Sequence, residues 1–344
     1  MAPENPTTAG QAAEASRGAG VSVLFDFDGT LGDTERPAME VAFWMIAPYL
    51  PSLEGKTDEE LLAECPVYVR ENAGKAFEHM IEACDKQREA VGLPGAEATR
   101  AAKQEPPALL AAVDRRREAL GLRPIAELRS QGKEPATLLQ QQKDDTVVRL
   151  SVAARPCPGV PEALESLQAM QVDFVIATTS GKPRVPVCVD TAGLRHFFKS
   201  DDLHIHSGES DFDPPCFKPA PDVYLRAASY VKQSPSCCVA VEDSASGVGS
   251  ASNAGIGLIV GYVGAGHIAP EQRESHAQML MKGTRAQNGR GADVVIEDMR
   301  DLPLVVRHFA AMVAAGRGGD GRSQQPMKVG ELSGILGRAH FRAD

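Results

Sequence analysis

Five short apolar runs, each about as long as one strand, constrain the fold of this 344-residue chain more than any other feature. Between them lie stretches with helical periodicity, such as residues 159–170 and 221–233. Strands that are apolar throughout are buried on both faces, and their alternation with helices indicates a parallel sheet covered on both sides. We therefore predict a doubly wound α/β domain. The runs are residues 21–27, 172–178, 237–241, 258–263 and 293–296.

The alternation of strands and helices is interrupted after the first run. From residue 34 to residue 155 the sequence shows only helical patterns, which predicts an all-helical domain inserted into the α/β core. The core would then comprise residues 21–33 and 156–312. Residues 1–20 contain no long apolar run, and residues 313–344 are rich in glycine and polar residues, so we expect a disordered lead and a flexible C-terminal tail.

Composition limits the possible partners and the cellular compartment. The formal net charge is −10 and no local basic patch offsets it, so nucleic acid is not an expected partner. No apolar run approaches the length of a membrane span, and seven scattered cysteines without CxxC pairs indicate reduced thiols. We therefore expect a cytoplasmic protein with no membrane partner, either a monomer or a homodimer. His204 and His206 have the spacing of a metal pair on a strand, but without an obvious third ligand we expect a structural or surface role.

Polar side chains follow the first two predicted strands. Asp26 and Asp28 come at the end of the first run, and strand alternation would direct both carboxylates to the same side. Residues 178–180, which are Thr-Thr-Ser, follow the second run and offer hydroxyl and N–H donors suited to phosphate oxygens. Ligands of open α/β sheets bind beyond the carboxyl ends of the strands, so these groups are expected to share one site.

Later strand ends add a cation and two more acids. Lys218 precedes a proline-rich helix start, and Glu242 and Asp243 end the run that begins at residue 237. Carboxylates that crowd together repel, and a divalent cation such as Mg²⁺, which prefers oxygen ligands, relieves that repulsion. This set of groups suits phosphoryl transfer, because an aspartate can accept the phosphoryl group covalently while cations neutralise its charge.

The sequence resembles the haloacid dehalogenase superfamily, in particular its phosphatases and β-phosphoglucomutases. The resemblance rests on four motifs that occur in order: DFDGT at 26–30, the Thr-Thr-Ser turn, KPAPD at 218–222 and VEDSASG at 241–247. It spans about residues 20 to 310 and implies a Rossmann-like core. The predicted helical insert, residues 34–155, lies where this family places its helical cap.

The resemblance also implies a role for each acid and for the lysine. Asp26 would attack phosphorus and become an aspartyl phosphate, and Asp28 would protonate the leaving oxygen and then activate water. Lys218 would offset negative charge on Asp26 and on the transferring group. Dehalogenases of the superfamily lack an aspartate at the position of Asp28, so this residue favours phosphate esters as substrates.

Binding residues follow from the same resemblance. Thr178 and the N–H of Thr179 would hold the phosphoryl group, together with Ser180. Mg²⁺ would be bound by Asp26, Asp28 through its backbone carbonyl, Asp243, and Glu242 directly or through water. Glu35, at the start of the helical insert, could touch the substrate.

These expectations leave the substrate open. We expect a Mg²⁺-dependent phosphatase of small phosphorylated metabolites such as sugar, polyol or glycolate-type phosphates. Two alternatives remain: a phosphosugar mutase, and a phosphometabolite-binding protein without turnover. Mutases of the family carry a histidine four residues beyond the threonine corresponding to Thr34, where this chain has Ala38, which weakens the mutase hypothesis.

Overall fold

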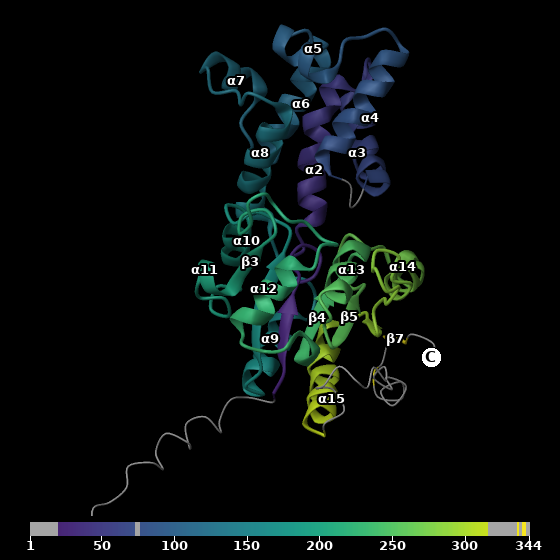
Figure 1. Cartoon of the computed structure of the whole chain (residues 1–344). Coiled ribbons are helices and arrows are strands. Elements are labelled where there is room, and N and C mark those ends of the chain that lie inside the picture. The colour runs from purple at the N-terminus through teal and green to yellow at the C-terminus, as the bar shows by residue number, and fades with distance from the viewer. Residues whose placement is uncertain (1–19, 73–75, 316–335, 337–338, 342–344) are drawn as a thin grey trace, which may run out of the picture. The chain divides into compact units, whose positions relative to one another are not determined.

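The computed structural model describes residues 20–72, 76–315, 336 and 339–341 (Figure 1). Contacts between Cα atoms divide the chain into two compact units. The first comprises the described residues within 1–32, 156–185 and 194–344, and the second comprises those within 33–155 and 186–193. Residues 1–19, the greater part of the expected lead, and most of the expected tail lie outside the described residues.

A seven-stranded sheet forms the centre of the first unit, with the strand order β3-β2-β1-β4-β5-β6-β7. All neighbouring pairs are parallel except β6 and β7, so the predicted doubly wound α/β fold is confirmed. The strands are β1 (Ser22–Phe25), β2 (Asp173–Thr178), β3 (Ile205–Ser207), β4 (Cys238–Glu242), β5 (Leu258–Tyr262), β6 (Val294–Ile296) and β7 (Ala339–Phe341).

Five strands correspond to the five apolar runs, and two were not expected. The first strand ends at Phe25, two residues before the end of its run, because the chain then turns away from the sheet. β3 is only three residues long and contains His206, so it lacks the apolar run that marks the others. β7 lies within the expected tail, and for its residues that expectation is wrong.

Helices cover the sheet between the strands. α12, α13 and α14 contact neighbouring strands and each other, whereas α9 packs against α15. Crossovers between parallel strands are right-handed, and the chain moves from β1 to β2 in one direction and from β4 to β5 in the other, so α9 and α13 lie on opposite faces. The helices of the first unit are α9 (Val160–Ala169), α11 (Asp201–His204), α12 (Asp222–Tyr230), α13 (Ala245–Asn253), α14 (Arg273–Met281) and α15 (Leu302–Ala314).

The second unit is helical, apart from its turns, and has a core of its own (Figure 1). Buried aromatic and aliphatic residues of α2, α3, α4 and α6 form this core, with Phe43 and Trp44 in edge-to-face contact. The buried side chain of Arg117 is paired with Asp145 at 2.7 Å. Its helices are α2 (Glu35–Ile46), α3 (Asp58–Asn72), α4 (Phe77–Ala90), α5 (Ala96–Ala102), α6 (Pro107–Ala119), α7 (Ile125–Ser130), α8 (Leu138–Ala153) and, from its second residue on, α10 (Val185–Thr191).

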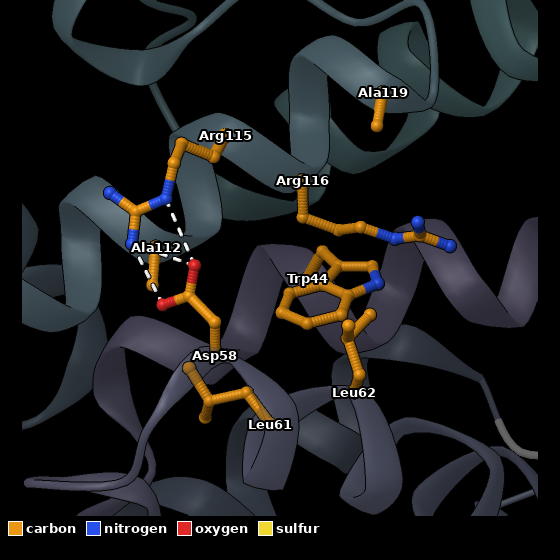
Figure 2. Close-up of a pocket in the computed structure, with 8 residues that line it drawn as sticks. All are labelled: Trp44, Asp58, Leu61, Leu62, Ala112, Arg115, Arg116 and Ala119. Atoms are coloured by element: carbon orange, nitrogen blue, oxygen red, sulfur yellow. Dashed lines mark hydrogen bonds and ion pairs between the residues drawn. The ribbon is translucent and has the colours of Figure 1, made fainter.

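A small pocket of about 170 Å³ lies among α2, α3 and α6 of this helical unit (Figure 2). On one side of it Arg115 and Asp58 form a bidentate ion pair with distances of 2.7 to 3.0 Å. The Arg116 guanidinium carbon lies 5.9 Å from the centroid of the Trp44 ring. None of the residues that line this pocket belongs to the predicted catalytic motifs.

Among the helices of the described ranges, none combines the length and the apolarity that crossing a bilayer would require.

Candidate active site

The carboxyl end of β1 lies at the point of the sheet where successive strands of the chain stop being added on one side and begin to be added on the other. The chain passes from β1 to β2 on one side and later places β4 on the other side, so β1 marks the topological switch point. Ligands of doubly wound sheets bind in the crevice that such a reversal opens. Asp26 directly follows β1, and its N–H still donates to the Val241 carbonyl of β4 at 3.0 Å. The fold therefore places the Asp26 side chain at this crevice.

A tight turn follows Asp26 and requires glycine at its tip. The Phe27 carbonyl accepts the N–H groups of Thr30, Leu31 and Gly32 at 3.3, 3.0 and 2.8 Å. Gly29 has a φ of 79°, in the left-handed region that favours glycine. A Cβ atom at Gly29 would lie 2.1 Å from Asp243 Oδ2, so the absence of a side chain there lets this acid approach the turn.

Lys218 connects two acids of different strands. Its Nζ lies 2.6 Å from Asp26 Oδ1 and 2.5 Å from Glu242 Oε1, and its side chain is 3% exposed. Tyr224 of α12 also donates to Glu242 Oε1, at 2.6 Å. Burial alone would lower the pKa of Lys218, but the charges of Asp26 and Glu242 hold it above the usual value. Lys218 is therefore a buried ammonium group fixed beside Asp26.

The positive charge of Lys218 alone does not keep the pKa of the Asp26 carboxyl at its ordinary low value. Burial raises its pKa to about 7, because the opposing effect of Lys218 is countered by the nearby charges of Glu242 and Asp28. A carboxylate in such a site is held ionised by a further cation close to it. The electrostatics of the site thus favour a bound cation next to Asp26.

The acids that could hold a metal form one group. Asp26, Glu242 and Asp243 each offer a carboxylate oxygen, and these atoms lie within 4.8 Å of one another. Within the part of the chain that the structure describes, no other cluster of His, Cys, Asp or Glu meets this condition. Hard oxygen donors of this kind fit Mg²⁺, so the residues present suit the cation that the sequence predicts.

Two histidines of the C-terminal part of the core hold Asp243. His267 Nε2 lies 3.4 Å from Asp243 Oδ2, and His276 Nε2 lies 2.6 Å from the Asp243 carbonyl oxygen. Burial and the neighbouring His276 lower the pKa of His267 to about 4, so this contact is made by a neutral imidazole. The Thr30 hydroxyl also donates to Asp243 Oδ1, at the long distance of 3.5 Å.

Asp28 has neighbours different from those of Asp26. The Ser180 hydroxyl donates to Asp28 Oδ2 at 2.6 Å, and Arg184 forms an ion pair with Asp28 Oδ1. Thr178, at the end of β2, accepts the Ser180 N–H through its hydroxyl at 3.1 Å. Both acids lie beyond β1, so the turn, and not strand alternation, determines where their side chains point.

The predicted residues therefore fall into three groups. Asp26, Lys218, Glu242 and Asp243 lie together, and Asp28 and Ser180 lie in direct contact next to Thr178. Thr179 follows Thr178 in the same turn. Glu35 is half-buried as the first residue of α2 and belongs to the helical unit.

Sequence reasoning missed four residues that contact the predicted set: Arg184, Tyr224, His267 and His276. Arg184 lies four residues after the Thr-Thr-Ser turn, and a search for cations near that motif could have found it. Tyr224 lies in α12, two residues after the KPAPD motif, whereas His267 and His276 reach the site from a loop and from α14, which carry no recognisable motif. Their positions depend on tertiary packing, which local patterns do not show.

Comparison with known proteins places this site in context. A protein-family model described as "Hydrolase: haloacid dehalogenase-like hydrolase" matches residues 22–255, more than half of the chain. The probable pseudouridine-5'-phosphatase of Drosophila melanogaster is 37% identical over 123 residues, which cover 35% of this chain and 52% of that relative. The chain spans about half the length of the curated relatives it matches.

Two solved structures share the fold. A conserved haloacid dehalogenase-like protein of unknown function from Agrobacterium tumefaciens superimposes with a TM-score of 0.51 at 24% identity, covering 85% of this chain and 98% of that chain. A hydrolase of the same family from Deinococcus radiodurans, solved with bound phosphate and sodium, gives a TM-score of 0.50 at 22% identity, covering 86% and 96%.

Proposed function

Because the chain belongs to the haloacid dehalogenase-like hydrolase family, we propose that it is a Mg²⁺-dependent phosphatase of small phosphorylated metabolites. The observation that carries this proposal is the buried Asp26 carboxyl, 2.6 Å from the Lys218 ammonium and two residues before a second acid, Asp28. Sugar, polyol and glycolate-type phosphates are the substrates we expect. The phosphatase name of the Drosophila relative and the phosphate bound to the Deinococcus hydrolase support this substrate chemistry.

Reaction would begin at Asp26. One carboxylate oxygen attacks phosphorus, the bond from phosphorus to the ester oxygen breaks, and an aspartyl phosphate forms. Asp28 gives its proton to the departing ester oxygen. In the second step Asp28 takes a proton from water, which attacks phosphorus and releases inorganic phosphate with regeneration of Asp26.

The remaining residues hold and neutralise the transferring group. Lys218 offsets its charge, while Thr178, the N–H of Thr179 and Ser180 provide donors for its oxygens. Asp26, Asp243, the Asp28 carbonyl and, directly or through water, Glu242 would hold Mg²⁺, which when bound would stabilise negative charge on the phosphoryl oxygens. His267 and His276 would keep Asp243 in place for this role.

The helical unit would select the substrate. We place it at residues 34–155 and propose that Glu35 contacts the bound ester, as its position directly after the catalytic turn suggests. A cytoplasmic location is also part of the proposal, supported by the absence of a disulfide bond among the seven cysteines, which all lie in the described residues.

A panel of phosphate esters tests the proposed function. Sugar, polyol and glycolate phosphates are incubated with the protein, with Mg²⁺ and after chelation, and released phosphate is measured. We expect release that depends on Mg²⁺ and disappears in Asp26→Asn, which keeps the size of the side chain. Isomerised ester without released phosphate would indicate a mutase instead. Absence of both products across the panel would contradict any catalytic role and leave a binding protein.

A further inference from the structure

Arg184 and Ser180 together occupy both oxygens of the Asp28 carboxylate. The Arg184 guanidinium pairs with Oδ1, and the Ser180 hydroxyl donates to Oδ2 at 2.6 Å. A carboxylate oxygen held in an ion pair with a guanidinium is fixed toward that cation and is less available to pass a proton to an ester. Asp28 therefore acts on the leaving group more readily when Arg184 takes another partner.

The backbone of the segment that carries both donors is firmly held. The Ser207 hydroxyl donates to the Ser180 carbonyl at 2.8 Å, and the Lys182 N–H donates to the Ser210 hydroxyl at 3.0 Å. The Arg184 N–H donates to the Gly181 carbonyl at 3.0 Å. Release of Asp28 is therefore a movement of a side chain, not of the whole segment.

Of the basic side chains near the acids, Arg184 is the one best placed to change its partner. Lys218 is 3% exposed and held by Asp26 and Glu242, and Lys182 pairs with Asp211 at 2.7 Å. The Arg184 side chain is 25% exposed, so its guanidinium can also be reached by a ligand. An arginine fork binds carboxylate or phosphate groups in two-point contacts, which makes an anion its natural alternative partner.

We propose that Arg184 is a specificity-determining residue that favours phosphate esters whose leaving group carries a second anionic group. This inference rests on the proposed phosphatase function. A carboxylate or second phosphate on the leaving group takes the guanidinium from Asp28 Oδ1, which frees that oxygen for proton transfer to the ester oxygen. An ester with an uncharged leaving group provides no such anion. Arg184 then stays paired with Asp28, and proton transfer from Asp28 to the ester oxygen remains slow.

Binding of unreactive analogues tests the proposal without turnover. Propylphosphonate, 3-phosphonopropionate and ethane-1,2-bisphosphonate differ only at the end that mimics the leaving group: methyl, carboxylate or phosphonate. Titration calorimetry of the full-length protein with Mg²⁺ should show both anionic analogues binding about tenfold more tightly than propylphosphonate. Arg184→Gln should remove this difference, and Arg300→Gln, a matched change at an exposed arginine that pairs with Asp298, should keep it.

The two anionic analogues also separate the possible second groups. A preference for 3-phosphonopropionate alone assigns a carboxylate, and a preference for the bisphosphonate alone assigns a phosphate. If the wild-type protein binds all three equally or binds none of them, or if Arg184→Gln keeps the preference, the proposal is wrong. Failure of the proposed phosphatase function is recognised separately, by the absence of turnover in the ester panel.

Steady-state kinetics give a second readout, the ratio of kcat/KM for an ester with a charged leaving group to that for an ester with an uncharged one. Loss of a merely structural role of Arg184 would lower both values equally. For phosphoglycolate, Arg184→Gln should lower kcat/KM by about tenfold or more, and Arg184→Lys should restore part of the loss. For ethyl phosphate, whose leaving group is uncharged, kcat/KM should stay the same or rise. Equal losses for both esters would show that Arg184 only supports the fold, and would overturn its role in specificity.

Discussion

Gly29 has the most restricted backbone position among the residues around the acids. Its φ of 79° costs an alanine about 1 kcal/mol, and a Cβ atom there would lie 2.1 Å from Asp243 Oδ2 and 2.8 Å from His267 Cε1. We predict that Gly29→Ala lowers kcat by about 100-fold, because it displaces an acid needed for the cation. Steady-state hydrolysis of the best ester of the panel measures the effect.

Gly255→Ala is the matched control for this substitution. Gly255 has a φ of 72°, but its Cβ position has no atom within 4 Å, so the variant has the backbone strain without the clash. It should lose stability of about 1 kcal/mol in urea unfolding and keep its activity. Equal activity of the two variants would contradict the role assigned to Gly29.

His206 makes stability depend on pH. Burial lowers its pKa to about 4 from the ordinary 6.5, and neither ring nitrogen has a hydrogen-bond partner among the described residues. The folded state therefore resists protonation. The contribution of neutral His206 to the free energy of unfolding is complete above pH 6.5, the pKa of the group in the unfolded state. It is lost as the pH falls toward 4, and the loss amounts to about 3 kcal/mol.

Comparison with His206→Leu isolates this contribution. The substitution removes the titrating ring without breaking a hydrogen bond that the structure records. Urea unfolding at about pH 7.5 and about pH 5 should show the variant gaining stability relative to wild type at the lower pH. A difference between the two proteins that does not change with pH would refute the prediction.

At the level of residues, the sequence predicts those parts of the site that follow strand ends. Asp26 and Thr178 lie at the ends of apolar runs and Asp243 lies two residues after one, so the position of each run also places the side chain. Arg184 and His267 could not be placed in this way. Arg184 contacts Asp28 from a turn that lies 156 residues further along the chain, and His267 contacts Asp243 from a loop that lies 24 residues further along, through contacts that only the packed core creates.

The strands themselves were predictable to different degrees. β1, β2, β4, β5 and β6 are buried on both faces and carry continuous apolar runs, so length and composition identify them. β3 holds its place by pairing with β2 over three residues, one of which is His206. A strand this short has no periodicity of its own, and its pairing is a tertiary property.

α13 offers a test at the level of an element. This helix follows β4, its first N–H groups are capped by Ser244, and the Gly247 Cβ position lies 1.8 to 2.2 Å from the Glu242 carboxylate. We predict that Gly247→Ala displaces Glu242 and with it Lys218, lowering kcat/KM by about tenfold or more.

The expected loss is specific to the contact, because alanine favours a helix more than glycine does. Ser246→Ala, the neighbouring change in the same helix, should leave kcat/KM within about twofold of wild type. Circular dichroism and the midpoint of thermal unfolding check that both variants are folded. Full activity in Gly247→Ala would show that the packing of α13 against Glu242 does not matter for the site.

At the scale of the whole molecule, the helical unit has its own core. Its buried cluster includes Trp44, the single tryptophan of the chain, and draws all its members from residues 39–138. We predict that a fragment of residues 33–155 folds by itself. It should show helical circular dichroism, blue-shifted emission from the buried Trp44 and one cooperative urea transition. A fragment with solvent-exposed tryptophan emission and a gradual transition would contradict this independence.

The central claim is that Asp26 carries the phosphoryl group during hydrolysis. Asp28→Asn should slow the second step, so that the intermediate accumulates when the variant is mixed with Mg²⁺ and a reactive ester and quenched in acid. Peptide mass spectrometry should then find one added phosphoryl group on Asp26, and none in the double variant that also carries Asp26→Asn. Hydrolysis by the wild type without any phosphorylated peptide in Asp28→Asn, or with the phosphoryl group on another residue, would contradict the account.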